Sequence, residues 1–196
     1  MAMLACAALW IAGSEPSAGV VFASNPRTET YSTERDEYSM KAAFLVHFAY
    51  YTEWPNDAFE DEDDPIVITV VGRDPFGTKL EDTFEGRELH GRGLVVERIA
   101  SLPEDEPLKA HVVYCALRSA KKRKALFEAM RERPILTIGE ARDFAAGGAA
   151  INFYLEKHRV RFQINRQALE RGELEVSSEL LKLARPIEER KPEDKG

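Results

Sequence analysis

Cysteine is scarce in this sequence, and its scarcity excludes a fold that is stabilised by several disulfides. The 196 residues include two cysteines, and Cys6 lies inside an apolar N-terminal run that we expect to be removed. The remaining Cys115 cannot form an intramolecular disulfide alone, so the fold must depend on a hydrophobic core. A chain with 44% hydrophobic residues can build one. We expect Cys115 to be a small buried side chain within it.

Residues that bind metals or perform catalysis are equally sparse. The four histidines lie in different predicted elements, and none has the i, i+4 or Cys/His spacing of a zinc site. No serine lies in a G-x-S-x-G motif, and no nucleophile is paired with a base. We therefore predict a protein without catalytic residues, metal or cofactor. His47 lies on the apolar side of a predicted helix and is expected to be partly buried.

The chain also lacks the excess of positive charge that general nucleic-acid binding requires. Its formal net charge is −7. The basic run Lys121–Lys124 opens a predicted helix without interleaved aromatic residues, and we interpret it as a solvated face. The acidic run Glu60–Asp64 lacks the turn glycine of a calcium loop, so we predict a solvated loop there.

The N-terminal apolar run, residues 1–12, is shorter than the roughly 20 residues that a membrane-spanning helix needs. We interpret residues 1–23 as a signal peptide for export, cleaved near Ala23, although no Lys or Arg precedes the run. The alternative is an apolar helix packed on the body. We further predict a flexible leader at 24–36, one domain at 37–186 and a disordered tail at 187–196.

Strands and helices alternate along the rest of the chain. The apolar runs PIVITVVG, GLVVERI, HVVYCAL and PILTIGE predict buried parallel strands, and SAKKRKALFEAMRER predicts a helix. In GRDPFGTK, Thr78 precedes Lys79, whereas a phosphate-binding loop needs Lys directly after the second glycine. We interpret that motif as a helix start with Asp74 as its N-cap. The fold class is α/β, a sandwich with a largely parallel central sheet flanked by helices.

The segment RDEYSMKAAFLVHFAYYTEWP predicts an amphipathic helix that ends before Pro55. Apolar and aromatic residues recur in it at spacings of three and four. The expected buried stripe comprises Met40, Ala43, Phe44, His47, Tyr51 and Trp54.

The segment INFYLEKHRVRFQIN predicts a C-terminal antiparallel hairpin, because apolar and polar residues alternate on both sides of a charged turn. Its other face sets Tyr154 beside Arg161, which allows a cation–π pair. The turn is either Lys157-His158 or a four-residue loop over 156–159. The apolar pairs that set the register are Ile151 with Ile164, Phe153 with Phe162, and Leu155 with Val160.

Three residues fall at the carboxyl ends of predicted strands, where ligand pockets of α/β proteins form. They are Gly72, Gly139 and Glu140. A small-molecule pocket at these residues is one possibility that we keep open. The other is that Glu140 forms a cap or loop hydrogen bond.

Four blocks of the sequence together resemble the YfiR/HmsC-like family of exported bacterial regulators. They are MKAAFLVHFAYYTEWP, ITVVGRDPFG, ILTIGEARDFAAGGAAINFYLEKHRVRFQIN and VSSELLKLAR, and the resemblance spans roughly residues 38–186. Their order and spacing are more specific than any single block. The acidic insertion and the single remaining cysteine depart from the family, and the latter removes the disulfides that stabilise some members.

The resemblance implies a periplasmic protein, commonly a homodimer, that represses an inner-membrane diguanylate cyclase of the YfiN type by contacting its periplasmic sensor domain. It implies control of cyclic-di-GMP signalling and biofilm formation without an enzymatic step. The alternative function is a periplasmic small-molecule sensor that acts on another membrane partner. Because Tyr, Trp and Arg favour interface hot spots, the residues expected to bind the partner are Tyr50, Trp54, Tyr154, Arg159 and Arg161.

Overall fold

The computed structural model describes residues 26–103, 107–141, 144 and 147–187, with the side chains of the first helix described from residue 36 onward. The predicted signal peptide and nearly all of the predicted tail lie outside these residues. The elements follow the order α1 (Pro26–Tyr50), β1 (Thr52–Glu53), η1 (Asn56–Ala58), β2 (Ile66–Gly72), α2 (Lys79–Phe84), β3 (Leu94–Ile99), β4 (Val112–Ala116), α3 (Ala120–Met130), β5 (Leu136–Gly139), β6 (Ile151–Glu156), β7 (Arg159–Ile164), α4 (Arg166–Arg171), β8 (Glu175–Val176), α5 (Ser178–Leu183) and β9 (Arg185–Pro186).

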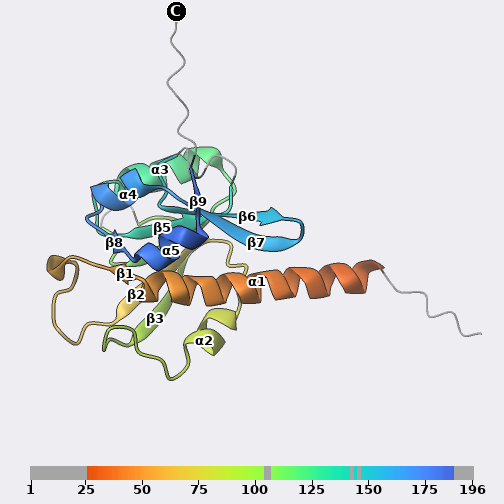
Figure 1. The fold of residues 1–196 in the computed structure, drawn as a ribbon, viewed down its shortest axis with the longest axis horizontal. Coiled ribbons are helices and arrows are strands. Elements are labelled where there is room, and N and C mark those ends of the chain that lie inside the picture. Colours follow the sequence, from red (N-terminus) through yellow and green to blue (C-terminus); the bar gives the residue numbers. More distant parts are fainter. Residues whose placement is uncertain (1–25, 104–106, 142–143, 145–146, 188–196) are drawn as a thin grey trace, which may run out of the picture.

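A seven-stranded sheet in the order β3-β2-β4-β5-β6-β7-β9 forms the centre of the molecule (Figure 1). Its strands pair in parallel except for the antiparallel pair β6 and β7. Strand β2, next to the edge strand β3, is apolar on both faces except for Thr69, and its even-numbered residues 66, 68 and 70 are fully buried. The α/β class with a largely parallel sheet is therefore confirmed.

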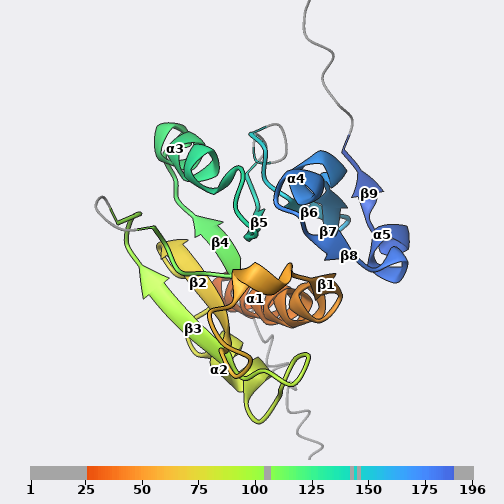
Figure 2. The same ribbon diagram turned by 90° about the vertical axis from the view of Figure 1, so that its left-hand side faces the viewer.

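Two apolar cores fill the space on the two faces of this sheet. The larger one packs α1, α2 and α5 against the sheet, and the smaller one packs α3 against the other face. Figure 2 shows α1 and α3 on opposite sides of the sheet. Cys115 belongs to the smaller core and is buried, as predicted.

The buried face of α1 differs from the predicted stripe. Met40 is 53% exposed and His47 is exposed, so both predictions were wrong. The helix also ends at Tyr50, which leaves Trp54 beyond it, and it begins at Pro26 within the segment expected to be a flexible leader. Lys41, which the predicted stripe did not include, lies on the buried side of the helix. The buried residues of α1 are Lys41, Ala42, Leu45, Val46, Phe48 and Ala49.

The hairpin has the predicted register in all its pairs. The two-residue alternative for its turn is correct, because Glu156 pairs with Arg159 and both Lys157 and His158 have positive φ, as a type I′ turn requires. On the α1 side, the rings of Phe153 and Phe162 lie 5.5 and 4.9 Å from the ring of Phe48. The hairpin is therefore fixed to α1 by aromatic packing.

Gly139 at the end of β5 allows the close approach of a buried aromatic ring. A Cβ atom at this position would lie 2.2 Å from Cε2 of Phe144, which is fully buried in the smaller core. The glycine is thus required by packing against Phe144, not by an unusual backbone angle.

Substitution of Gly139 by Ala should lower the free energy of unfolding by about 1–3 kcal/mol, because the added methyl group overpacks the smaller core. The matched control is Gly93→Ala, whose Cβ meets no atom within 4 Å and should change stability by less than about 1 kcal/mol. Urea denaturation of both variants measures the difference. Equal stability of the two variants would contradict the packing argument.

Candidate functional site

The carboxyl edge of the sheet holds a cluster of polar side chains around the buried Lys41, which lies in the middle of α1. Lys41 is only 2% exposed, and its ammonium group lies 2.5 Å from Oε1 of Glu37. The same ammonium contacts the carboxylate of Glu140, which follows β5. The Tyr38 hydroxyl donates a hydrogen bond of 2.9 Å to Glu140. A buried cation requires such partners, so these contacts connect α1 to the strand end.

The Tyr114 hydroxyl is buried beside this cluster and has no hydrogen-bond partner among the described residues. Burial raises the pKa of Tyr114 well above its usual range, and the negative charge of Glu140 raises it further. The Glu140 carboxylate acts on the Tyr114 hydroxyl through its charge, because the two groups are not placed to form a hydrogen bond. The ring of Phe76 packs edge-on against Tyr38 and Tyr114, with centroid distances of 5.6 and 4.7 Å. Tyr114 therefore remains a neutral phenol enclosed by aromatic rings.

The three residues predicted to line a ligand pocket have structural contacts of their own. Glu140 forms an ion pair with Lys41, and Gly139 packs directly against the ring of Phe144. Gly72 has φ of 110° and lies against the backbone at the end of β4, since a Cβ here would be 2.7 Å from the carbonyl carbon of Ala116. The contacts that the structure describes for Glu140 are with the side chains of Tyr38 and Lys41 in α1, which differ from the cap or loop hydrogen bond that we considered. A ligand pocket at these residues stays a prediction.

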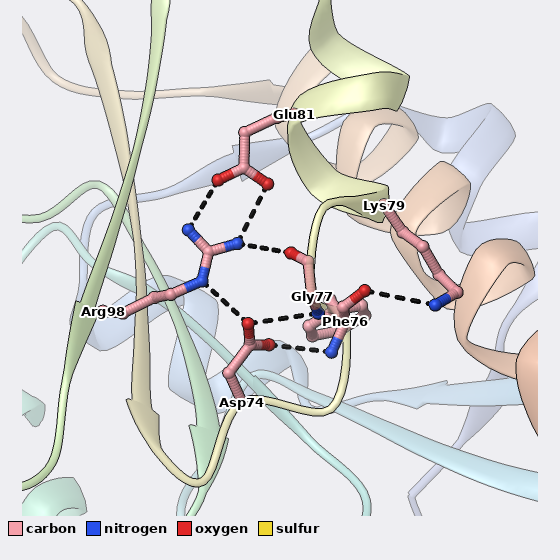
Figure 3. A network of polar contacts seen from close by, with 6 residues as sticks. All are labelled: Asp74, Phe76, Gly77, Lys79, Glu81 and Arg98. Carbon is pink, nitrogen blue, oxygen red and sulfur yellow. Dashed lines mark hydrogen bonds and ion pairs between the residues drawn. The ribbon is translucent and has the colours of Figure 1, made fainter.

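The GRDPFGTK segment forms a loop that is closed by Arg98 of β3 (Figure 3). The Arg98 guanidinium donates to Oδ2 of Asp74 at 2.7 Å, to both carboxylate oxygens of Glu81 at 2.5 and 2.9 Å, and to the Gly77 carbonyl at 2.6 Å. These contacts lower the pKa of Glu81, with its hydrogen bonds to Arg98 as the largest cause. The guanidinium N–H groups of Arg98 on this side therefore donate to groups of the loop and of α2.

Asp74 does not cap α2 as we predicted. Its carboxylate accepts from the backbone N–H groups of Phe76 at 2.7 Å and Gly77 at 3.2 Å, so it closes a turn before the helix. The helix itself starts at Lys79, with Thr78 at its N-cap. The difference arises because an Asx turn and an N-cap use the same short carboxylate and the same spacing.

The predicted partner-binding residues fall into two separate groups. Tyr154, Arg159 and Arg161 lie together on the hairpin, which extends past the carboxyl end of β5. Tyr50 lies at the C-terminal end of α1. It is half exposed and stacks on His90, with the ring centroids 5.8 Å apart.

Trp54 lies with Tyr50 at the amino edge of the sheet and is partly buried. Its indole N–H donates to the carbonyl of His111 at 3.3 Å. The structure therefore gives Trp54 a role within the fold.

The hairpin residues form a polar face on the side of the sheet away from α1. Arg159 and Arg161 are exposed, and the ion pair that Arg161 forms within the described part of the chain is a long one, 3.7 Å from Glu156. The cation over the Tyr154 ring is Arg185 of β9, at 5.8 Å, in place of the cross-strand pair with Arg161 that we considered. Arg185 also binds Glu156 at 2.6 Å and so supports the hairpin from its neighbouring strand.

Sequence reasoning missed Lys41 and Arg98, the two cations that organise the polar clusters. For Arg98 a signal was available. It lies one residue before the end of a predicted strand, and the neighbouring predicted strand leads into an acidic turn. For Lys41 the sequence offered none, because lysine is rarely buried unless it is paired. In the described part of the chain, no group of three His, Cys, Asp or Glu side chains is placed to hold a metal ion. No helix there is both long and apolar enough to cross a membrane.

His111 anchors the loop that contains η1 to the amino edge of the sheet. Its Nδ1 accepts the backbone N–H of Val67 at 3.0 Å, so Nε2 carries the proton and donates to the Ala58 carbonyl at 3.1 Å. The His111 ring stacks on the Phe59 ring, with the two centroids 4.3 Å apart. The Arg92 guanidinium carbon lies over the Phe59 ring, 3.7 Å from its centroid. Burial lowers the pKa of His111, and the charge of Arg92 acts in the same direction.

Neutralising Glu140 should destabilise the protein, because the buried Lys41 ammonium then retains only Glu37 as a charged partner. We expect Glu140→Gln to lower the free energy of unfolding by about 1–3 kcal/mol in urea denaturation. In the Lys41→Met background the same change should cost less than about 0.5 kcal/mol. The control is Glu60→Gln, which breaks the ion pair with Lys109. The Glu60 and Lys109 side chains are 76% and 81% exposed, so this change should lower the free energy of unfolding by less than about 1 kcal/mol. Additive effects of the first two substitutions would contradict the pairing.

Stability should fall with acidification below pH 6.5, the ordinary pKa of histidine, because the unfolded chain binds a proton at His111 that the folded protein resists. The decrease continues down to the lowered pKa of the folded state, with a slope of at most about 1.4 kcal/mol per pH unit. His111→Gln should remove this component from the pH dependence of thermal unfolding. His47→Gln, at an exposed position, should leave it unchanged.

One comparison with known proteins bears on this architecture. The sequence profile described as YfiR/HmsC-like matches residues 38–185, which extend from the middle of α1 through the hairpin to β9. The match includes Lys41 and Glu140, the Arg98 loop and all of the seven-stranded sheet except Pro186. The chain therefore belongs to the YfiR/HmsC-like family, a family of regulators.

Proposed function

We propose that this protein is a periplasmic regulator that binds the periplasmic sensor domain of an inner-membrane diguanylate cyclase and represses it. Through that partner it would control cyclic-di-GMP signalling and biofilm formation. Membership of the YfiR/HmsC-like family supports the regulatory role. The structural observation that carries the proposal is the exposed polar face of a rigid hairpin.

The hairpin suits a partner because its shape is established before binding. Its six cross-strand pairs and the two-residue turn fix the backbone, and Phe48 holds its apolar side. Arg159 and Arg161 remain exposed on this framework, and Leu155 near the turn is 55% exposed. A preorganised surface loses little conformational entropy on association, so contacts from Arg and Tyr can contribute fully to affinity.

A small-molecule sensor is the second function that the sequence left open. It would use Gly72, Gly139 and Glu140 at the strand ends. These residues already pack or pair within the fold, and the hairpin residues do not depend on a ligand for their arrangement. We therefore place protein binding first.

Charge reversal at Arg161 tests the proposal directly. Isothermal titration of the protein with the sensor domain of a candidate diguanylate cyclase should give saturable binding. Arg161→Glu should weaken it by at least about 30-fold, the loss typical of a hot-spot arginine. The thermal midpoint should stay within about 2 °C of wild type, because among the described residues the ion pair lost is a long surface contact with Glu156.

The matched control is Arg87→Glu, an equal charge change at an exposed loop position between α2 and β3. It should alter the affinity by less than about 3-fold, since screening weakens distant surface charges. Absence of binding at tens of micromolar, or equal effects of both reversals, would contradict the use of the hairpin. A thermal-shift screen with small metabolites would then test the sensor function.

A further inference from the structure

The first turn of α3 presents a group of exposed cations that the fold does not use. We call Arg118, Lys121, Lys122 and Lys124 the α3 basic patch; all four are exposed. The opposite side of the helix buries Leu126, Phe127 and Met130 in the smaller core, so the lysines project away from the sheet.

The position of these cations opposes the stability of the helix. Ser119 caps α3 by accepting from the Lys122 N–H, and no acidic residue lies in the first turn. The N-terminus of a helix carries partial positive charge, so cations there are unfavourable. Folding alone therefore gives no reason for placing three lysines at this end.

The patch is also unpaired within the protein. Among the residues that the structure describes, none of its four cations forms an ion pair. The neighbouring Arg123 differs, because its guanidinium turns back and donates to the carbonyl oxygens of Leu117 at 3.2 Å and Arg118 at 2.7 Å. The charges of the patch are thus available to an external anionic surface.

The composition of the patch indicates what kind of surface this is. Protein interfaces are rich in aromatic residues, Met and Arg and poor in Lys, whereas the patch is mostly lysine, and no large apolar residue lies between its charges, which are separated by Ser119, Ala120 and Arg123. Nucleic-acid binding would favour aromatic stacking platforms, and α3 presents no exposed aromatic residue. Clustered lysines without apolar anchors are typical of electrostatic attraction to anionic phospholipids.

We propose that the α3 basic patch docks this protein on an anionic phospholipid membrane surface. The net charge of −7 opposes approach through the rest of the molecule, so the patch sets the orientation. Because α3 and α1 cover opposite faces of the sheet, docking through α3 leaves α1 turned away from the lipid (Figure 2).

Vesicle cosedimentation tests the proposal without any protein partner. The protein is purified from the periplasm of an expressing bacterium, so that any leader has been processed, and is mixed with vesicles of phosphatidylcholine with or without phosphatidylglycerol. Binding should require phosphatidylglycerol and decrease as salt rises from about 50 to about 300 mM. Lys121→Glu/Lys122→Glu should weaken it by at least about 25-fold. The same variant should melt about 2–4 °C higher, because its new charges favour the helix N-terminus.

The matched control is Lys157→Glu/Lys182→Glu, which makes the same change in net charge at exposed positions on the hairpin turn and α5. It should reduce vesicle binding by less than about 3-fold. Equal binding to neutral vesicles, an equal loss in the control, or a lower melting temperature of the α3 variant would overturn the proposal. Binding to a diguanylate cyclase sensor domain without any binding to vesicles would also overturn it, while leaving the proposed function intact.

Discussion

The packing of α1 across the parallel sheet is the constraint on which the rest of this structure depends. Its buried side supplies Ala42, Leu45 and Phe48 to the larger core, where they contact the strands and the hairpin. Without this helix, β2, β4 and β5 would expose one apolar face, and Phe153 and Phe162 would lose the ring against which they pack. The position of the hairpin is thus a consequence of how α1 lies.

The same helix carries a buried charge to the carboxyl edge of the sheet, and that charge decides how the edge is used. In many α/β proteins this edge binds a ligand. Here the ammonium of Lys41 lies between Glu37 and Glu140, and the ring of Phe76 packs beside it against Tyr38. Arg98 closes the neighbouring loop in a similar way. Side chains of the chain itself therefore occupy positions where an enzyme of this class would hold substrate.

The surfaces that remain for external partners are chemically different. The hairpin offers Arg159 and Arg161 on a rigid two-stranded framework, whereas the first turn of α3 offers lysines with small neighbours. Tyr154 and Arg161 point to the side of the sheet away from α1, which is also the side that α3 covers. A protein that meets a membrane receptor beside its lipid surface could use both surfaces at once. This arrangement suits a regulator that recognises and holds a partner.

The sequence by itself determined the α/β class, the six longer strands and the hairpin register, whereas the two-residue strands β1, β8 and β9 were not predicted. β-branched runs and strict alternation are local patterns, and a shift by one residue would expose Phe153 and Phe162. Only the tertiary structure decided which side of α1 is buried and where the cations lie. Burial of Lys41 depends on Glu140, 99 residues away, and the loop at Asp74 is tied to the sheet by Arg98 from another strand. Such long-range pairing overrides local preference because a buried charge must find its partner wherever the chain places one.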